Sequence, residues 1–192
     1  MKEVLFIQGA GRRVHEEWDV KLVESLQREL GPGYDIRYPR MPNEADPTLA
    51  SWQPTLEREL ASLRKGAIVV GHSVGGTMLI DVLAQSAPPT ALDAIVLIAA
   101  PFIGKGGWTS DDIAPPADLG RLPVTTPVFL YHGEHDAIIP VAHVELYAKK
   151  IPRARVRRLA GRDHQLNNDL SEVASDIREL ESHASRRKKS LR

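Results

Sequence analysis

A serine stands between glycines in the hexapeptide GHSVGG at residues 71–76. The apolar run AIVV, at 67–70, comes directly before it and predicts a buried strand. Where such a strand turns sharply into a helix, the crowded backbone needs small residues two positions before and after the central one. This turn would lift the Ser73 hydroxyl above the strand end, where it could act as a nucleophile. The plainer interpretation is a helix N-cap serine flanked by packing glycines, and the pattern alone leaves both open.

A serine nucleophile needs a base, and the base needs an acid that orients it. The sequence GEHDAIIP, at 133–140, follows an apolar run and offers Asp136 as the acid. His164 follows a further strand-like segment, at 154–159, and offers the base. The carboxyl ends of parallel strands share one sheet edge, where open α/β sheets bind ligands. Asp163 is the other acid that could orient His164, but neighbouring side chains normally point apart, so Asp136 is preferred.

The chain order Ser, Asp, His, with a glycine-flanked serine after a buried strand, resembles the α/β-hydrolase superfamily. The resemblance is closest to compact serine hydrolases with little cap, such as the retinoblastoma-binding group, and spans about residues 1–181. It implies Ser73 as nucleophile, His164 as base and Asp136 as orienting acid. It also implies that the first strand here is the family's third, so that the family's first two strands are missing.

The loop after the first predicted strand has the sequence QGAG at 8–11. The resemblance implies that the backbone N–H groups of Ala10 and Val74 form an oxyanion hole, because such groups stabilise negative charge as it develops. Gln8 stands where the family often has His. This difference keeps the donor itself but leaves the support of the loop in question.

The segment 101–127 contains no predicted helix or strand, yet it carries several large apolar residues among its glycines and prolines. A loop of this length in a compact domain is commonly a lid or a binding loop. We therefore expect it to form a minimal cover over the site. Apolar residues close to the proposed triad in chain order predict the substrate pocket, and they are Phe102, Ile103, Trp108 and Ile139.

The catalytic candidates need a parallel sheet to position them. Short apolar runs predict strands at 4–7, 34–38, 67–70, 94–98, 128–131 and 154–159, the last an alternating edge strand. Apolar side chains at helical spacing predict helices between them, and Asn167 or Asn168 is the expected N-cap of the last. The order predicts a single doubly wound α/β domain at 1–183, with about six mostly parallel strands and helices on both faces. A basic, disordered tail at 184–192 would follow.

Composition narrows the function classes. The chain has 192 residues, 25 basic and 25 acidic side chains, and no cysteine, which excludes disulfides and thiol catalysis. Five of the cations lie in the tail, which leaves 20 positive and 25 negative groups elsewhere. Such an acidic body argues against nucleic-acid binding, although a nucleic-acid or membrane role for the tail stays open. The longest apolar run, 94–100, is shorter than the roughly 20 residues of a membrane span, so we expect a cytoplasmic protein without stable membrane association.

Two cofactor interpretations compete with the hydrolase. The sequence GAGRRV, at 9–14, follows a strand like a dinucleotide fingerprint but has Val14 where its third glycine belongs. A group of four polar residues could suggest a metal site but lacks a supporting His-Glu-x-x-His helix; it comprises His132, Glu134, His135 and Asp136. We expect neither a cofactor nor a metal.

The sequence thus predicts a serine hydrolase that cleaves small carboxylic esters or thioesters through an acyl-enzyme. The rival from another class is a binding protein that kept the fold and acts on a protein partner. The complete set of serine, acid and base favours the enzyme. The physiological substrate and the oligomeric state do not follow from the sequence.

Overall fold

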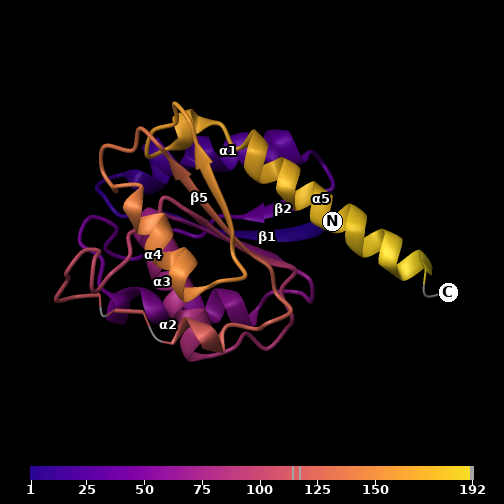
Figure 1. The fold of residues 1–192 in the computed structure, drawn as a ribbon, viewed down its shortest axis with the longest axis horizontal. Coiled ribbons are helices and arrows are strands. Elements are labelled where there is room, and N and C mark those ends of the chain that lie inside the picture. Colours follow the sequence, from indigo (N-terminus) through magenta and orange to yellow (C-terminus); the bar gives the residue numbers. More distant parts are fainter. Residues whose placement is uncertain (114, 117, 191–192) are drawn as a thin grey trace.

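A computed structural model describes residues 1–113, 115–116 and 118–190, with side chains up to residue 182. Its centre is one sheet of six strands in the order β2-β1-β3-β4-β5-β6, and every neighbouring pair is parallel (Figure 1). The strands are β1 (Lys2–Ile7), β2 (Tyr34–Arg37), β3 (Ile68–His72), β4 (Ala94–Ile98), β5 (Val128–Gly133) and β6 (Arg155–Leu159). All six predicted strands are therefore present, and the predicted α/β architecture is confirmed.

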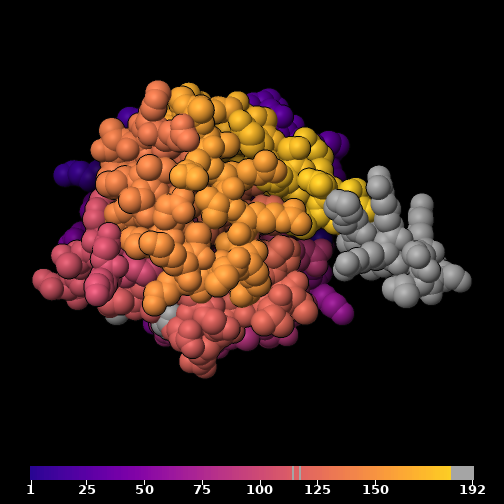
Figure 2. Space-filling model, viewed as in Figure 1, coloured from indigo at the N-terminus to yellow at the C-terminus, as the bar shows by residue number. Residues whose placement is uncertain are grey.

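The four inner strands are buried on both faces, as their continuous apolar runs require. Strand β6 lies at the edge, as its alternating sequence predicts, and three of its five residues are exposed. Residues around β6, drawn in orange, form much of the face seen in Figure 2.

In the described part of the chain, five α-helices cover the two faces of the sheet. They are α1 (Asp19–Leu30), α2 (Leu49–Ala61), α3 (Ser73–Gln85), α4 (Ala142–Lys150) and α5 (Ser171–Ser190). Helices α1 and α5 pack on one face, while α2, α3 and α4 pack on the other (Figure 1). Alternate residues of each inner strand serve the two layers: Phe6 packs with the first group of helices and Ile7 with the second. The core is thus two apolar layers separated by the sheet.

Two helices have starts that the sequence pattern does not specify correctly or at all. Helix α2 begins with Thr48 as N-cap, and Pro54 lies further into the helix than its first turn. Helix α5 begins only at Ser171, so the prediction of Asn167 or Asn168 as its N-cap is wrong. Both asparagines have left-handed backbone, with φ of 56° and 55°, in the connection before the helix. Asp169 accepts the Ser171 N–H at 3.0 Å instead.

Most apolar side chains in the described part of the segment 101–127 pack into the core instead of forming the expected cover. Its apolar residues Phe102, Ile103 and Leu119 are buried in the layer shared with α3 and α4. A short helical turn, Leu119–Arg121, lies within it. These side chains are numerous because they fill the core, which the length of the loop did not reveal.

Helix α5 continues through Ser190, where the sequence predicts the tail at 184–192. Side chains beyond 182 and residues 191–192 lie outside the described part of the chain, so the disordered tail stays a prediction. Among the described residues, every helix is too short or too polar to cross a bilayer.

Candidate active site

The turn between β3 and α3 presents Ser73 at the carboxyl edge of the sheet. Ser73 has left-handed backbone with φ 51°, a conformation that a non-glycine residue keeps only under strong constraint. A Cβ at Gly71 would lie 2.5 Å from the Cα of Gly76, and one at Gly75 would lie 1.9 Å from the Gln8 carbonyl oxygen. The glycines are therefore required for the backbone to pack around a serine that projects outward.

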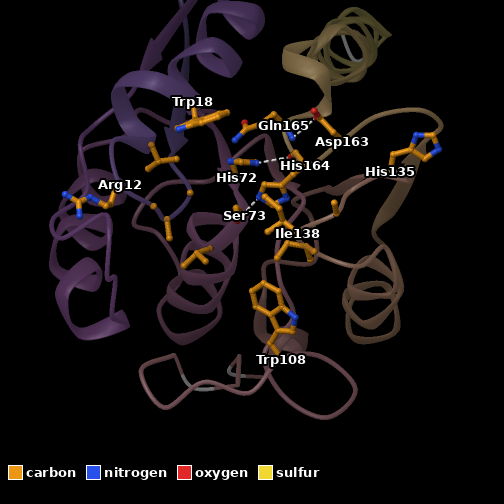
Figure 3. A pocket seen from close by; sticks show the side chains of 17 residues that line it. Arg12, Trp18, His72, Ser73, Trp108, His135, Ile138, Asp163, His164 and Gln165 are labelled. Carbon is orange, nitrogen blue, oxygen red and sulfur yellow. Dashed lines mark hydrogen bonds between the residues drawn. The ribbon is translucent and has the colours of Figure 1, made fainter.

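The structure brings Ser73, His164 and Asp136 together, although up to 91 residues separate hydrogen-bonded partners. The Ser73 Oγ lies 3.1 Å from the His164 Nε2 (Figure 3), and the His164 Nδ1 lies 2.8 Å from an Asp136 carboxylate oxygen. The loops that carry the acid and the base lie close together. A Cβ at Gly133 would be only 2.4 Å from the Asp163 carbonyl oxygen, so the approach requires a glycine there. This is the geometry in which a base takes a proton from a serine hydroxyl.

Of the two candidate acids, Asp136 contacts His164 and Asp163 does not orient it. The Asp163 carboxylate accepts the N–H groups of Gln165 and Asn167, at 3.0 and 2.7 Å, and the residue is exposed. It shapes the loop that carries the base. The two neighbouring side chains point to different partners, as adjacent positions normally do.

Hydrogen bonds hold Asp136 as a carboxylate. Its buried side chain accepts the N–H groups of Ile138 and Ile139, each at 2.8 Å, and lies 3.3 Å from the His132 Nε2. Burial opposes ionisation, but the hydrogen bonds from His132, His164 and Ile139 outweigh it and hold the pKa of Asp136 below its usual range. His132 therefore acts on the orienting acid and is itself buried.

The environment favours the neutral form of His164. Burial lowers the pKa of His164 below its usual 6.5, and the charge of His72 lowers it further, while the hydrogen bond to Asp136 opposes both. Because Asp136 accepts from Nδ1, the proton of the neutral ring sits there and Nε2 is left with a free electron pair toward Ser73. The imidazole is thus in the tautomer that can accept the serine proton.

The loop after β1 runs alongside the serine. A Cβ at Gly9 would lie 3.1 Å from the Ser73 Cβ, so the loop and the turn touch. Ala10 and Val74 line the same cavity as Ser73. In the part of the chain that the structure describes, neither residue's N–H donates to a protein acceptor. Both groups are placed where they can serve a ligand oxygen.

Gln8 supplies the support that the missing histidine left in question. Its side chain is buried, accepts the Met41 N–H at 3.1 Å and donates to the Glu44 carboxylate at 2.9 Å. The Glu44 carbonyl oxygen in turn accepts the Gly11 N–H at 2.6 Å. The segment after β2 therefore anchors the loop on both sides of Ala10.

A cavity of about 620 Å³ opens in front of Ser73. Trp18 and Trp108 lie on opposite sides of the serine, with Ile138 between (Figure 3). These three side chains are 53%, 39% and 59% exposed, an unusual exposure for large apolar residues. The cavity wall is therefore mainly apolar and open to solvent.

The predicted pocket residues divide into two pairs. Trp108 and Ile139 line this cavity, whereas Phe102 and Ile103 do not. The latter two are 5% and 3% exposed and line a separate hollow near Lys105. Sequence reasoning also missed Trp18, because its spacing with Leu22 indicated only a buried helix face.

Two further residues that the sequence did not single out lie at the site. Asp19 is fully buried and accepts from the Gly9 N–H at 2.7 Å and faces the His72 Nδ1 at 2.9 Å. A signal was present: Asp19 shares the helical spacing of Leu22 and Leu26, so an acid stands on the apolar face of α1. Buried acids are rare unless they have a partner.

Solved structures of other proteins share this fold at low sequence identity. The ydeN gene product of B. subtilis has a TM-score of 0.72 and 18% identity, over 95% of this chain and 100% of that chain. Est1E from Butyrivibrio proteoclasticus, with bound ferulic acid, has a TM-score of 0.65 and 16% identity, over 95% and 89%. Alpha/beta hydrolase domain-containing protein 10 from mouse has a TM-score of 0.63 and 20% identity, over 95% and 90%. At these identities the likeness shows the α/β-hydrolase fold alone.

Sequence comparison is more specific. No curated protein sequence matches the chain. A family model described as serine hydrolase matches residues 5–169, which include Ser73, Asp136 and His164. The match spans most of the chain, and the chain belongs to the serine hydrolase family.

Proposed function

We propose that the protein is an esterase that hydrolyses small carboxylic esters or thioesters through an acyl-enzyme on Ser73. The observation that carries this proposal is the continuous chain of hydrogen bonds from Ser73 through His164 to Asp136, at 3.1 and 2.8 Å. It opens onto an apolar cavity that could receive the substrate. Solved structures of the same fold include an esterase domain from Rhodothermus marinus and the esterase RhEst1 from Rhodococcus, which supports this chemistry.

In the proposed reaction, the Ser73 Oγ attacks the carbonyl carbon while its proton passes to the His164 Nε2. Asp136 holds the imidazole in the required tautomer and stabilises the imidazolium that forms. The N–H groups of Ala10 and Val74 donate to the carbonyl oxygen as it becomes negative. His164 then protonates the leaving alcohol or thiol. Water attacks the acyl-enzyme with His164 again as base, which releases the acid and restores Ser73.

The cavity favours small, uncharged substrates. Its walls are the exposed side chains of Trp18, Trp108 and Ile138, while Phe102 and Ile103 are packed into the core instead of extending the wall. Short acyl chains would be covered by such a wall, whereas long ones would leave methylenes in water and gain little further burial. We therefore expect esters such as nitrophenyl acetate and butyrate to be preferred over long-chain lipids.

A fluorophosphonate probe, which reacts with activated serines, tests the proposal directly. The wild-type protein should be labelled and should hydrolyse nitrophenyl butyrate, and Ser73→Ala should lose both while it keeps the wild-type circular dichroism spectrum. Ser182→Ala, at an exposed position of α5, is the matched control and should behave like wild type. Labelling that persists in Ser73→Ala would refute the nucleophile. A wild-type protein that neither reacts nor hydrolyses would favour the binding protein instead.

A further inference from the structure

A second buried Asp–His pair lies directly behind Ser73. Asp19 is the first residue of α1 and His72 is the last residue of β3, and they are 0% and 1% exposed. The Asp19 Oδ2 lies 2.9 Å from the His72 Nδ1. The chemistry of Ser73, His164 and Asp136 described above does not use this pair.

The hydrogen-bond partners of His72 determine how many protons it carries. Its Nδ1 faces an Asp19 oxygen that already accepts the Gly9 N–H at 2.7 Å. Its Nε2 faces the His164 carbonyl oxygen at 3.1 Å. A carboxylate that accepts from a backbone N–H and a carbonyl oxygen are both acceptors, so both ring nitrogens must donate. Only the imidazolium has two N–H donors, and His72 and Asp19 are therefore an ion pair.

The groups that surround His72 are consistent with this charge. Burial would lower the pKa of His72, but the charge and hydrogen bond of Asp19 outweigh it, helped by the His164 carbonyl and the charge of Asp136, and raise the pKa. The same pair acts on Asp19: its burial is outweighed mainly by His72, which holds the pKa of Asp19 below its usual value. The neutral Gln165 side chain also donates to Asp19, at 3.3 Å.

The pair touches three of the segments that the proposed reaction needs. Asp19 holds the Gly9 N–H, next to Ala10, whose own N–H faces the cavity. His72 precedes Ser73 in the chain and donates to the backbone of His164. Thus one carboxylate and one imidazolium tie together the oxyanion loop, the serine turn and the loop that carries the base.

We propose that Asp19 and His72 are positioning residues, whose buried ion pair fixes the positions of these three segments relative to one another. The inference rests on the proposed function, since these positions matter for activity only if Ser73 is acylated. A buried ion pair is a weak source of stability, because the loss of hydration offsets much of the attraction. The pair does fix the relative positions of the groups it joins, since the carboxylate accepts and the imidazolium donates hydrogen bonds only along defined directions.

Asp19→Asn removes the negative charge while it keeps the size of the side chain. His72 then loses its counter-charge and its second proton, so it can no longer donate to both the residue at position 19 and the His164 carbonyl. Misplacement of a catalytic group by about 1 Å can reduce the rate roughly 100-fold, and we expect kcat to fall about 10- to 100-fold with KM changed by less than about 3-fold. Fluorophosphonate labelling should slow in parallel.

The pH profile separates positioning from a general structural role. His72→Gln removes a positive charge beside His164, so the acid limb of kcat/KM should move to higher pH. In Asp19→Asn the Asp19 charge and, with the second proton, the His72 charge are both lost, so its acid limb should move less than that of His72→Gln. A control is Asp176→Asn, another buried acid, which accepts from Tyr131 and Arg157 at 2.6 Å on α5. This control should lower Tm but leave kcat, KM and the pH profile unchanged.

Nitrogen-15 NMR of the histidine rings in the wild-type protein needs no variant to fold. At pH 7.5, about one unit above the ordinary pKa of histidine, His72 should show two ring N–H groups. A singly protonated His72 would overturn the ion pair. Wild-type kcat in a folded Asp19→Asn, or losses matched by Asp176→Asn, would overturn positioning. If the wild type itself is not labelled by the probe, the proposed function fails; if it is labelled and Asp19→Asn reacts equally fast, only this inference fails.

Discussion

The two Asp–His pairs of this site have nearly the same Asp–His distance, but the second ring nitrogen of each histidine faces a different kind of partner. The Asp136–His164 and Asp19–His72 distances are 2.8 and 2.9 Å, and the two imidazole rings are 4.9 Å apart. The pairs differ at the second ring nitrogen. That of His164 faces the Ser73 hydroxyl, which can give up a proton, whereas that of His72 faces a carbonyl oxygen, which can only accept one. The partner on the far nitrogen, and not the Asp–His contact, decides which histidine can act as a base.

The electrostatics of the two rings follow the same division. Burial lowers the pKa of His164, the ring that must be neutral, although Asp136 opposes this. Asp19 outweighs burial and raises the pKa of His72, the ring that must be charged. Two histidines whose ring centroids are 4.9 Å apart can thus hold different charges at one pH, because each has its own hydrogen-bond partners.

Replacing Asp136, the acid that orients the base His164, should give the largest effect. In Asp136→Asn the amide N–H₂ can donate to the His164 Nδ1, which moves the ring proton to Nε2 and leaves no acceptor for the Ser73 proton. The analogous change in another serine hydrolase family reduces kcat about 10⁴-fold, and we expect a loss on the order of 10³- to 10⁴-fold. Steady-state kinetics on nitrophenyl butyrate, beside Asp19→Asn, measures it. Equal losses in the two variants would mean that the pairs are not functionally distinct.

The acid limb of activity should lie below the ordinary histidine pKa. Because the folded-state pKa of His164 is lower than 6.5, the neutral base persists to lower pH, and kcat/KM should reach half its plateau below pH 6.5. A pH series with nitrophenyl butyrate checks this. A midpoint above 6.5 would show that Asp136 outweighs burial in the free enzyme.

Stability should respond to His72 with the opposite sign. Its folded-state pKa is raised above 6.5, so its stabilising contribution is fully present below pH 6.5 and is lost as the pH rises through the folded-state value. Urea unfolding of Ser73→Ala with and without Asp19→Asn, as a function of pH, isolates the term. The difference between the two proteins should shrink at alkaline pH, and a constant difference would contradict the charge on His72.

The sequence predicted the Asp136–His164 pair but not the Asp19–His72 pair. Ser73, Asp136 and His164 each follow a separate apolar run, so parallel strands alone bring them to one edge. Asp19 and His72 are 53 residues apart; Asp19 belongs to no motif, and His72 lies inside GHSVGG at a position where the motif specifies no residue type. Their contact depends on how α1 docks against the end of β3, and docking is a property of three-dimensional packing.

The pocket shows the same limit. All six strands follow from local composition, but Phe102 and Ile103 are close to the triad only along the chain, and the core takes them. The spacing of Trp18 from Leu22 and Leu26 is typical of a buried helix face, yet the π-helical turn at Val14–Trp18 before α1 leaves Trp18 exposed at the cavity. Local spacing does not report the direction of a side chain at an irregular helix start.

Changes in the cavity wall should affect binding and spare both pairs. Trp18→Ala and Trp108→Ala each remove apolar surface that a substrate can cover, and partial burial of such a side chain contributes about 1 kcal/mol, or roughly a 5-fold rise in KM. The kcat should change little, unlike in Asp19→Asn. A series of nitrophenyl esters from two to sixteen carbons measures kcat/KM against chain length, with Val124→Ala, an exposed site away from this cavity, as control. A maximum at the longest chain would refute the open, shallow pocket.

Removal of the basic tail should have the smallest effect on either pair. Deleting 184–192 takes away five cations and no acid, so the protein becomes acidic, with a net charge near −5. The last described contacts of α5 join Glu181 to Lys2 and Tyr34, at the amino ends of β1 and β2. The triad lies at the carboxyl ends, about 16–20 Å along a strand of this length.

Salt at physiological strength screens exposed charges beyond roughly 8 Å, so the five cations should not reach His72 or His164. We therefore expect the truncated protein to keep its Tm within about 2 °C, its kcat/KM and the midpoint of its acid limb, because ordinary surface changes alter stability by only about 0.5 kcal/mol. Thermal unfolding and the pH series at both low and physiological salt provide the measurement. A shift in the acid limb that disappears with added salt would show that the tail's charge does act on the site. The Asp136–His164 pair would then be more sensitive to distant charges than its buried hydrogen bonds imply.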